Sequence, residues 1–194
     1  DDYQDKLSLL ETVKQVKPTI ILGLTGVGGI FTEEIIKEMA KHVKVPIIFP
    51  LSNPTSKAEC TAENAYRWTD GKCIFASGSP FKEVEYNGKI LKPAQSNNIY
   101  TYPGLGLGAL AGDAKMITDN MLNAVAMSVI ESVKESDYKE GRLFPKISKI
   151  PELSKSIALA VAKQAFKDGV VKYESEKSDA DLVKKINQRY WRPF

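Results

Sequence analysis

Three short apolar runs, each followed by small polar residues, organise the first half of the chain. The runs and their polar ends are residues 18–24 with 25–29, 47–51 with 52–55, and 72–76 with 77–80. Such runs are typical of buried strands in a parallel sheet. If the three strands are parallel neighbours, their polar ends line one crevice, at the edge where open α/β sheets bind ligands. Taken singly, each end also fits an ordinary turn, because turns favour the same residue types.

Helical periodicity fills the intervals between these runs. The predicted helices cover about 7–16, about 33–43 with Thr32 as the cap, and about 62–68 with Thr61 as the cap and Asp70-Gly71 as the end. Threonine caps supply a side-chain oxygen to the free N–H groups of the first turn, and Glu33 and Glu34 suit the helix dipole. The order of strand, glycine turn, capped helix and strand predicts a right-handed βαβ unit.

The second half of the chain changes pattern. Asn87-Gly88 lies between two short apolar patterns and is a strong signal for a β-hairpin. Glycines at the density of residues 105–112 favour close packing of this backbone against another element. The remaining predicted elements are helices at about 118–133 and 152–167, a loop at 141–145, and a short last helix capped by Ser178. The aromatic end at 190–194 is better suited to docking than to solvent.

Composition and charge indicate an ordinary globular protein. The 194 residues include 27 basic and 24 acidic side chains, interspersed to a net charge of +3, so we expect no nucleic-acid partner. No apolar run approaches the roughly 20 residues that span a bilayer. The given residues contain no signal-peptide pattern and no initiator methionine, and Asp1-Asp2-Tyr3 resembles a cut inside a longer protein, so any targeting segment is expected in the missing part.

The two cysteines and the candidate catalytic groups are not arranged as a complete site. Cys60, in a helical pattern, and Cys73, in a strand pattern, lack zinc-ligand spacing and are expected to be packing residues in a reducing, intracellular environment. The dinucleotide fingerprint fails in the glycine turn, because its third glycine would fall at Phe31. His42 is expected near a helix end. Glu59 is expected in the first part of a helix, as a cap or dipole partner.

Four ordered motifs resemble the carboxyl-terminal part of a malic enzyme, the family that oxidatively decarboxylates malate with NAD or NADP. The motifs are LSNPTSKAECT at 51–61, IFASGSPF at 74–81, NNIYTYPG at 97–104 and EGRLFP at 140–145. They occur in the family's order and spacing, and the resemblance extends from about residue 18 to about residue 166.

The resemblance implies roles for seven residues, which together form the predicted site. Asn53 and Asn98 match the two asparagines whose amides hold the substrate's carboxylate and neighbouring oxygens. The positions that match the cofactor's ribose and nicotinamide contacts are Leu24, Thr25, Gly26, Ser52, Asn53 and Gly78. The family's acid/base pair, its acidic ligands for the divalent metal, Mg or Mn, and its dinucleotide fingerprint have no counterparts here, so we expect no catalytic or metal-ligating residue in this chain.

The implied architecture is α/β, with part of a Rossmann-like parallel-sheet nucleotide-binding domain followed by carboxyl-terminal helices. We assign 1–97 to the nucleotide-binding domain, 98–166 to a helical segment that returns to the substrate domain, and 167–194 to a tail that contacts a neighbouring subunit. The implied partners are malate and pyruvate and further copies of the chain, as a dimer or tetramer. The implied location is the cytoplasm or a mitochondrion-like organelle.

The expected activity is conversion of malate to pyruvate and CO2, and the chain alone is expected to be inactive. Two alternatives remain open at this point. The same fold can serve a non-catalytic interaction or surface protein, or another NAD(P)-dependent dehydrogenase. Restoration of activity by the missing part would distinguish a malic enzyme from a non-catalytic protein. An upstream sequence without metal carboxylates would favour another dehydrogenase.

Overall fold

The computed structural model describes residues 7–139, 143–172 and 178–191, and the chain forms two compact units. Unit 1 contains Asp1–Ser96 and Lys139–Leu143, and unit 2 contains Asn97–Tyr138 and Phe144–Phe194. Each unit has its own hydrophobic core.

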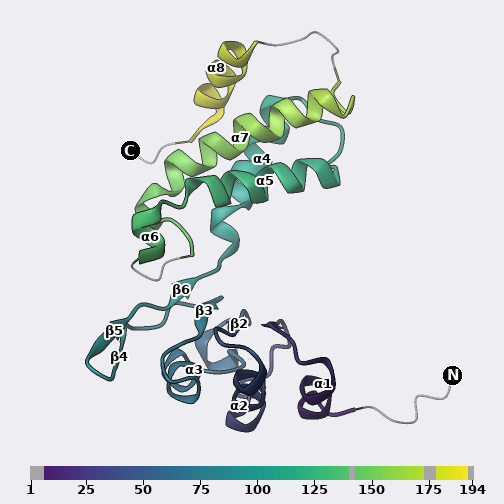
Figure 1. Cartoon of the computed structure of the whole chain (residues 1–194). Coiled ribbons are helices and arrows are strands. Elements are labelled where there is room, and N and C mark those ends of the chain that lie inside the picture. The colour runs from purple at the N-terminus through teal and green to yellow at the C-terminus, as the bar shows by residue number, and fades with distance from the viewer. Residues whose placement is uncertain (1–6, 140–142, 173–177, 192–194) are drawn as a thin grey trace, which may run out of the picture. The chain divides into compact units, whose positions relative to one another are not determined.

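Unit 1 is built on a four-stranded parallel sheet (Figure 1). Its strands, in spatial order, are β1 (Ile20–Gly23), β2 (Ile47–Pro50), β3 (Ile74–Ser77) and β6 (Ala94–Gln95). The register pairs Ile20 with Ile47, and Ile47 with Ile74. The prediction of three parallel, neighbouring strands is therefore confirmed, and β6 adds a strand that the sequence did not reveal.

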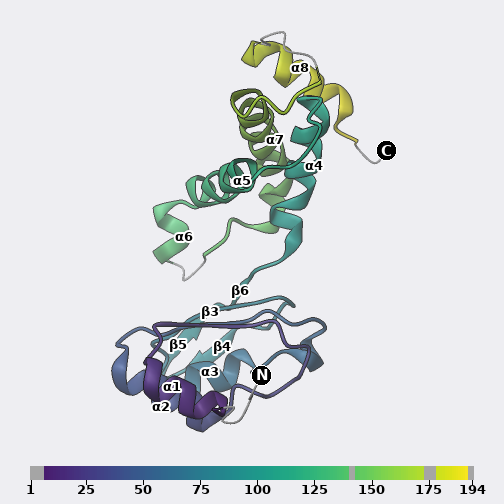
Figure 2. The same ribbon diagram turned by 90° about the vertical axis from the view of Figure 1, so that its right-hand side faces the viewer.

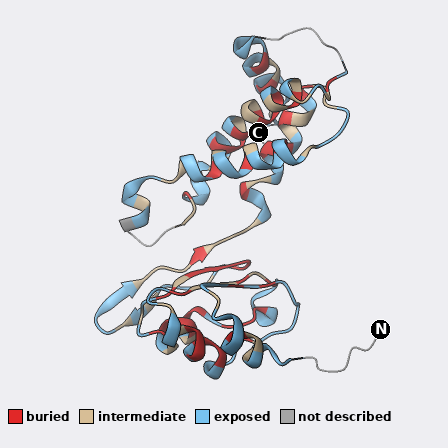
Figure 3. Ribbon diagram, turned by 45° about the vertical axis from the view of Figure 1, so that its right-hand side comes forward, coloured by how far each residue is buried: buried red, intermediate tan, exposed pale blue. Residues whose placement is uncertain are grey.

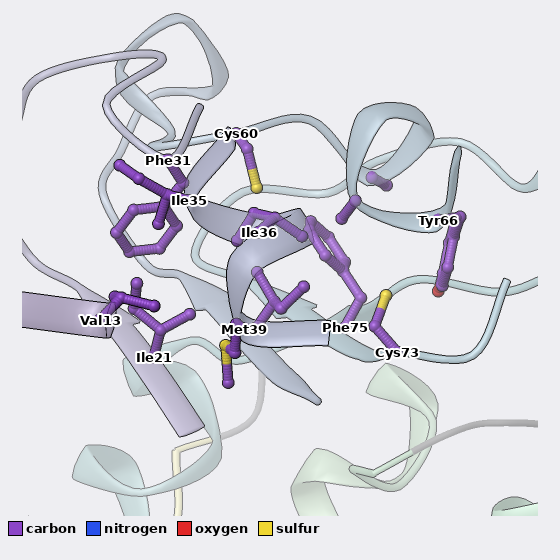
Figure 4. Packing of buried hydrophobic residues seen from close by; sticks show 13 residues of the cluster. Val13, Ile21, Phe31, Ile35, Ile36, Met39, Cys60, Tyr66, Cys73 and Phe75 are labelled. Carbon is purple, nitrogen blue, oxygen red and sulfur yellow. The ribbon is translucent and has the colours of Figure 1, made fainter. Parts of the chain in front are cut away.

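Three helices cover one face of this sheet (Figures 1 and 2). They are α1 (Leu9–Val16), α2 (Glu33–His42) and α3 (Ala62–Trp68). Each begins at a predicted or readily explained cap: Ser8 forms a capping box with Glu11, and the Thr32 and Thr61 hydroxyls accept N–H bonds. Figure 4 shows the resulting core, in which alternate strand residues such as Ile21 and Phe75 meet the helices.

The opposite face of the sheet is apolar but not covered by unit 1. Ile20 is 49% exposed and Leu22 is 58% exposed, whereas Ile21 between them is 8% exposed. This alternation is the ordinary two-faced geometry of a strand. Parallel sheets normally have both faces covered, so this face is suited to further packing.

A short hairpin and a single turn of helix complete unit 1. They are β4 (Val84–Tyr86) with β5 (Lys89–Leu91), and the 3-10 turn η1 (Thr55–Lys57). The strands are antiparallel and joined at Asn87 and Gly88, both at positive φ, as predicted. The hairpin is drawn largely in the pale blue of exposed residues in Figure 3.

Unit 2 is helical. Its elements are η2 (Asn98–Tyr100), α4 (Tyr102–Ala111), α5 (Asp119–Ser132), α6 (Glu135–Lys139), η3 (Ile147–Lys149), α7 (Ile150–Lys167) and α8 (Asp179–Arg189). The caps of α5 and α8 are Thr118 and Ser178, and Gly169 follows α7 at φ 66°. These three elements confirm the predicted helices, whereas α6 was not predicted. Part of the predicted loop at 141–145 lies outside the described residues, as do 192–194 of the aromatic end.

Helix α4 contacts α7 through its glycines. A Cβ at Gly104 would lie 2.6 Å from Ile157 Cβ, and one at Gly108 would lie 2.6 Å from the Ala158 carbonyl oxygen. The predicted close packing is confirmed, but the glycine-rich stretch is itself a helix. Burial against α7 outweighs the low helix propensity of glycine here.

The two cysteines are buried in unit 1. Cys60 and Cys73 are free thiols, although Cys60 precedes α3 rather than lying in it. Burial raises the pKa of the Cys73 thiol to about 11, which suits a packing role. Within the part of the chain that the structure describes, no helix is long and apolar enough to cross a membrane.

Candidate functional site

The carboxyl ends of β1, β2 and β3 lie at one edge of the unit 1 sheet, because the three strands are parallel neighbours. The loops that leave this edge begin at Leu24, Leu51 and Gly78. This is the edge at which open α/β sheets bind ligands. Six of the seven predicted site residues lie on these three loops: Leu24, Thr25, Gly26, Ser52, Asn53 and Gly78.

Backbone groups and one carboxylate tie the first two loops together. The Thr25 N–H and hydroxyl donate to Glu59 Oε1 at 2.9 and 2.8 Å, and the Ser52 hydroxyl donates to the same oxygen at 2.5 Å. The Gly26 N–H in turn donates to Ser52 Oγ at 2.9 Å. The glycine turn and the loop after β2 therefore share one hydrogen-bond network.

A second network orients the Asn53 amide. The Ser79 hydroxyl donates to Asn53 Oδ1 at 2.6 Å, and Asn53 Nδ2 donates to the Leu51 carbonyl at 3.2 Å. Gly78 must be glycine here, because a Cβ would lie 2.2 Å from the Leu51 carbonyl oxygen. The side chain of Asn53 is exposed, so its second N–H can reach a ligand.

The glycine turn leaves its backbone open. Gly26 and Gly29 have φ of 69° and 76°, a region that glycine adopts without strain, and nothing lies within 4 Å of where their Cβ atoms would be. Beside them Leu24 is 78% exposed. The edge thus presents the open backbone of Gly26, the apolar side chain of Leu24 and the amide of Asn53. An apolar contact and hydrogen-bond donors together suit a planar ring that carries polar substituents.

Asn98, the seventh predicted residue, belongs to unit 2. It begins η2, where the Asn97 side chain caps the turn by accepting from the Ile99 N–H at 3.0 Å. The Asn98 carbonyl accepts from Thr101, while its side chain is exposed and hydrogen-bonds to no described residue. Its amide is available to a ligand, and its assignment to the substrate site stays a prediction.

Glu59 is the site residue that sequence reasoning missed. It was expected in a helix, but it precedes α3 and is completely buried behind Thr25 and Ser52. Burial works to raise the pKa of its carboxyl, and the hydrogen bonds from Ser52 and Thr25 outweigh burial and lower it. No local pattern distinguishes this glutamate from a capping residue, because its partners lie 7 and 34 residues away.

The described residues form no candidate metal centre, and their one histidine ends a helix. In the described residues, 7–139, 143–172 and 178–191, no group of three or more His, Cys, Asp or Glu could hold a metal ion. His42 ends α2, as expected, and its Nε2 lies 3.3 Å from Glu38 Oε1. The polar groups that this edge does bring together are the hydroxyls of Thr25 and Ser52, the Glu59 carboxylate and the Asn53 amide.

A cavity also lies away from the strand ends, between α3 and β4. Its volume is about 220 Å3, and its lining residues are Glu63, Arg67, Glu83, Val84, Glu85 and Tyr86. Arg67 is already ion-paired with Glu63 at 2.7 Å. None of the predicted site residues lines this cavity, and the strand-end edge is the candidate site.

Together the parallel sheet, its helical cover on one face and the loops at its carboxyl edge define a nucleotide-binding domain of the Rossmann-like class. A sequence model described as "Malic enzyme, NAD binding domain" matches residues 1–166. The chain therefore belongs to the malic enzyme family.

Similar proteins agree with this assignment. The chain is 51% identical to an NADP-dependent malic enzyme of Dictyostelium discoideum over 95% of its length, and 47% identical to an NAD-dependent malic enzyme of Pectobacterium carotovorum over 100%. A crystal structure of Entamoeba histolytica malic enzyme shares the fold, with a TM-score of 0.70, 24% identity and coverage of 93% of this chain. The chain spans 34% of each of these proteins.

Proposed function

We propose that this chain supplies the nicotinamide-binding crevice and two substrate amides of an enzyme that oxidatively decarboxylates malate. The products are pyruvate and CO2, with reduction of NAD or NADP. The observation that carries the proposal is the meeting of Thr25, Ser52 and Asn53 at the ligand-binding edge of a parallel sheet, in a chain of the malic enzyme family. Since the chain spans about a third of its relatives, the activity belongs to a longer protein.

Each predicted residue has a role that its geometry allows. Asn53 has one amide N–H bound to Leu51 and its carbonyl oxygen bound to Ser79, so the second N–H is directed to a substrate carboxylate. Asn98 contributes an exposed amide as a further donor. Gly26 presents open backbone, and Leu24 an apolar contact for one face of the nicotinamide. NAD(P), when bound, accepts the hydride.

The metal is proposed to be held elsewhere. The described residues hold no cluster of three or more His, Cys, Asp or Glu that could bind Mg or Mn. The metal ligands and the acid/base groups are assigned to the remaining two thirds of the protein, and the chain alone is expected to be inactive.

The test is malate-dependent, manganese-requiring reduction of NAD and of NADP. It compares this chain alone with the full-length protein that carries it. Activity of the full-length protein alone is the expected result, and the faster nucleotide identifies the preferred cofactor. An inactive full-length protein would contradict the proposal and favour an interaction module, whereas an active chain would show that the catalytic groups lie within it.

We also propose a homo-oligomeric, intracellular enzyme, in the cytoplasm or a mitochondrion-like organelle. Trp191 is 74% exposed after α8, which suits contact with a neighbouring subunit. Sedimentation of the full-length protein and of its Trp191→Ala variant tests this contact. A dimer or tetramer that is weakened by the substitution is expected. A monomeric wild-type protein would contradict the proposed oligomer. The proposed location is tested separately, by fluorescence microscopy of a tagged full-length protein.

A further inference from the structure

The carboxylate of Glu59 places a full negative charge behind Thr25 and Ser52, which line the candidate crevice. Its exposed fraction is 0%, and its three shortest hydrogen bonds all reach one oxygen, Oε1. From the described residues, the other oxygen, Oε2, accepts the Ser52 N–H alone, at 3.4 Å. Lowering of its pKa by these hydrogen bonds keeps the carboxyl ionised at neutral pH.

No cation neutralises this charge among the residues of unit 1 that the structure describes. Among the described residues, no lysine, arginine or histidine forms an ion pair with Glu59. An ionised group without a counter-ion is costly to bury, even when it is well hydrogen-bonded. A glutamine could keep an acceptor at Oε1, but its NH2 group would replace Oε2, which accepts the Ser52 N–H, so these donors favour a carboxylate.

The fold reserves space for this side chain. A Cβ at Gly23, the last residue of β1, would lie 2.4 Å from Glu59 Cδ. The carboxyl group therefore occupies the position that a side chain at Gly23 would fill. The hydrogen bonds and the space at Gly23 thus hold the negative charge of Glu59 at the carboxyl ends of β1 and β2, directly behind Thr25 and Ser52.

On the basis of the proposed function, we propose that Glu59 is a positioning residue whose fixed charge makes the crevice bind oxidised nucleotide more tightly than reduced nucleotide. The oxidised nicotinamide ring is a cation and the reduced ring is neutral. A negative charge in a poorly solvated position attracts the first and has little effect on the second. The same residue holds Thr25 and Ser52 in place for both forms.

The test is the affinity of the full-length protein for NAD(P)+ and for NAD(P)H, measured separately by calorimetry without malate. Glu59→Gln keeps an acceptor at Oε1 and removes the charge, at the cost of the long Ser52 N–H contact to Oε2. We expect it to weaken binding of the oxidised form by about tenfold more than binding of the reduced form. Glu63→Gln, the same change at an exposed residue of α3, serves as the control and should leave the ratio of the two affinities unchanged.

A double variant keeps the test valid if Glu59→Gln does not fold. Gly23→Ala combined with Glu59→Ala removes the charge, and the new methyl group at position 23 fills the space that the carboxyl group leaves. Thermal unfolding verifies that the double variant is folded. It should shift the ratio in the same direction. If both affinities fall by the same factor, so that their ratio is unchanged, the inference is overturned while the proposed function stands. A wild-type protein that binds neither nucleotide would overturn the proposed function and this inference with it.

Discussion

At the scale of single residues, Glu59 joins loops that are far apart in the sequence. Thr25 and Ser52 both donate to its Oε1, so the ends of β1 and β2 are held by one side chain. Charge-assisted hydrogen bonds of this kind are stronger than neutral ones. Their strength depends on ionisation of the carboxyl, which makes the stability of unit 1 sensitive to acid.

The pH dependence of this contribution has a definite sign. The pKa of Glu59 is lowered in the folded state, so its contribution is complete above the ordinary glutamate pKa of about 4.3 and is lost as pH falls through the lower folded value. The difference in urea midpoint between wild type and Glu59→Gln should therefore shrink below pH of about 4. Urea unfolding across this range tests it, and a constant difference would contradict it.

Asn98→Ala tests the proposed substrate contact. In the full-length protein it should raise the malate KM or lower kcat by more than about tenfold, equivalent to about 1.4 kcal/mol for a hydrogen bond to a charged ligand. Asn97→Ala is the matched control. It removes the cap on the Ile99 N–H and should cost about 1 kcal/mol of stability, with a smaller effect on malate kinetics than Asn98→Ala. Unchanged kinetics in Asn98→Ala would remove this residue from the site.

At the scale of elements, the contact of α4 with α7 depends on the absence of side chains. Gly104 and Gly108 on α4 meet Ile157 and Ala158 of α7 at distances that leave no room for a Cβ. Close approach lets the two backbones bury one another, and Ile157, Ala158 and Val161 are all fully buried. This packing repays the conformational cost of glycine in a helix.

Two alanine substitutions on α4 should have opposite effects. In Gly108→Ala, the new Cβ meets the Ala158 carbonyl at 2.6 Å, and separation of the helices should cost about 1–3 kcal/mol. In Gly106→Ala, nothing lies within 4 Å, and the gain in helix propensity should stabilise by up to about 1 kcal/mol. Thermal unfolding of both variants tests this, and equal effects would contradict packing as the reason for glycine.

At the scale of the whole molecule, unit 1 has an apolar sheet face that its own helices do not cover. Ile20 and Leu22 are about half exposed there. The relatives are about three times as long as this chain, so the rest of such a protein is a suitable cover. The chain alone is then expected to self-associate through this face.

Leu22→Thr tests the uncovered face. Threonine retains strand propensity, so in the chain alone it should lower self-association and dye binding while stability changes by less than about 0.5 kcal/mol. The neighbouring change Ile21→Thr, on the 8% exposed side, should cost more than about 2 kcal/mol. Light scattering and urea unfolding give both results. A severe loss of stability in Leu22→Thr alone would show that the face is covered within the chain.

The sequence alone determined those features that depend on neighbouring residues. The apolar runs predicted β1, β2 and β3, the threonines at 32 and 61 predicted the starts of α2 and α3, and Asn87-Gly88 predicted the hairpin. Such signals are local, because caps, turns and strand periodicity act over a few residues. The convergence of polar loops at one edge followed from these strands and their parallel order.

Only the tertiary structure decided the features that depend on distant partners. The burial of Glu59 needs Thr25, which lies 34 residues away, and the helical state of α4 needs α7, more than 40 residues further along the chain. Local propensity opposes both, since a buried charge and a glycine-rich helix are each unfavourable alone. They become stable only when the folded chain supplies four hydrogen bonds to the first and a closely fitting surface to the second.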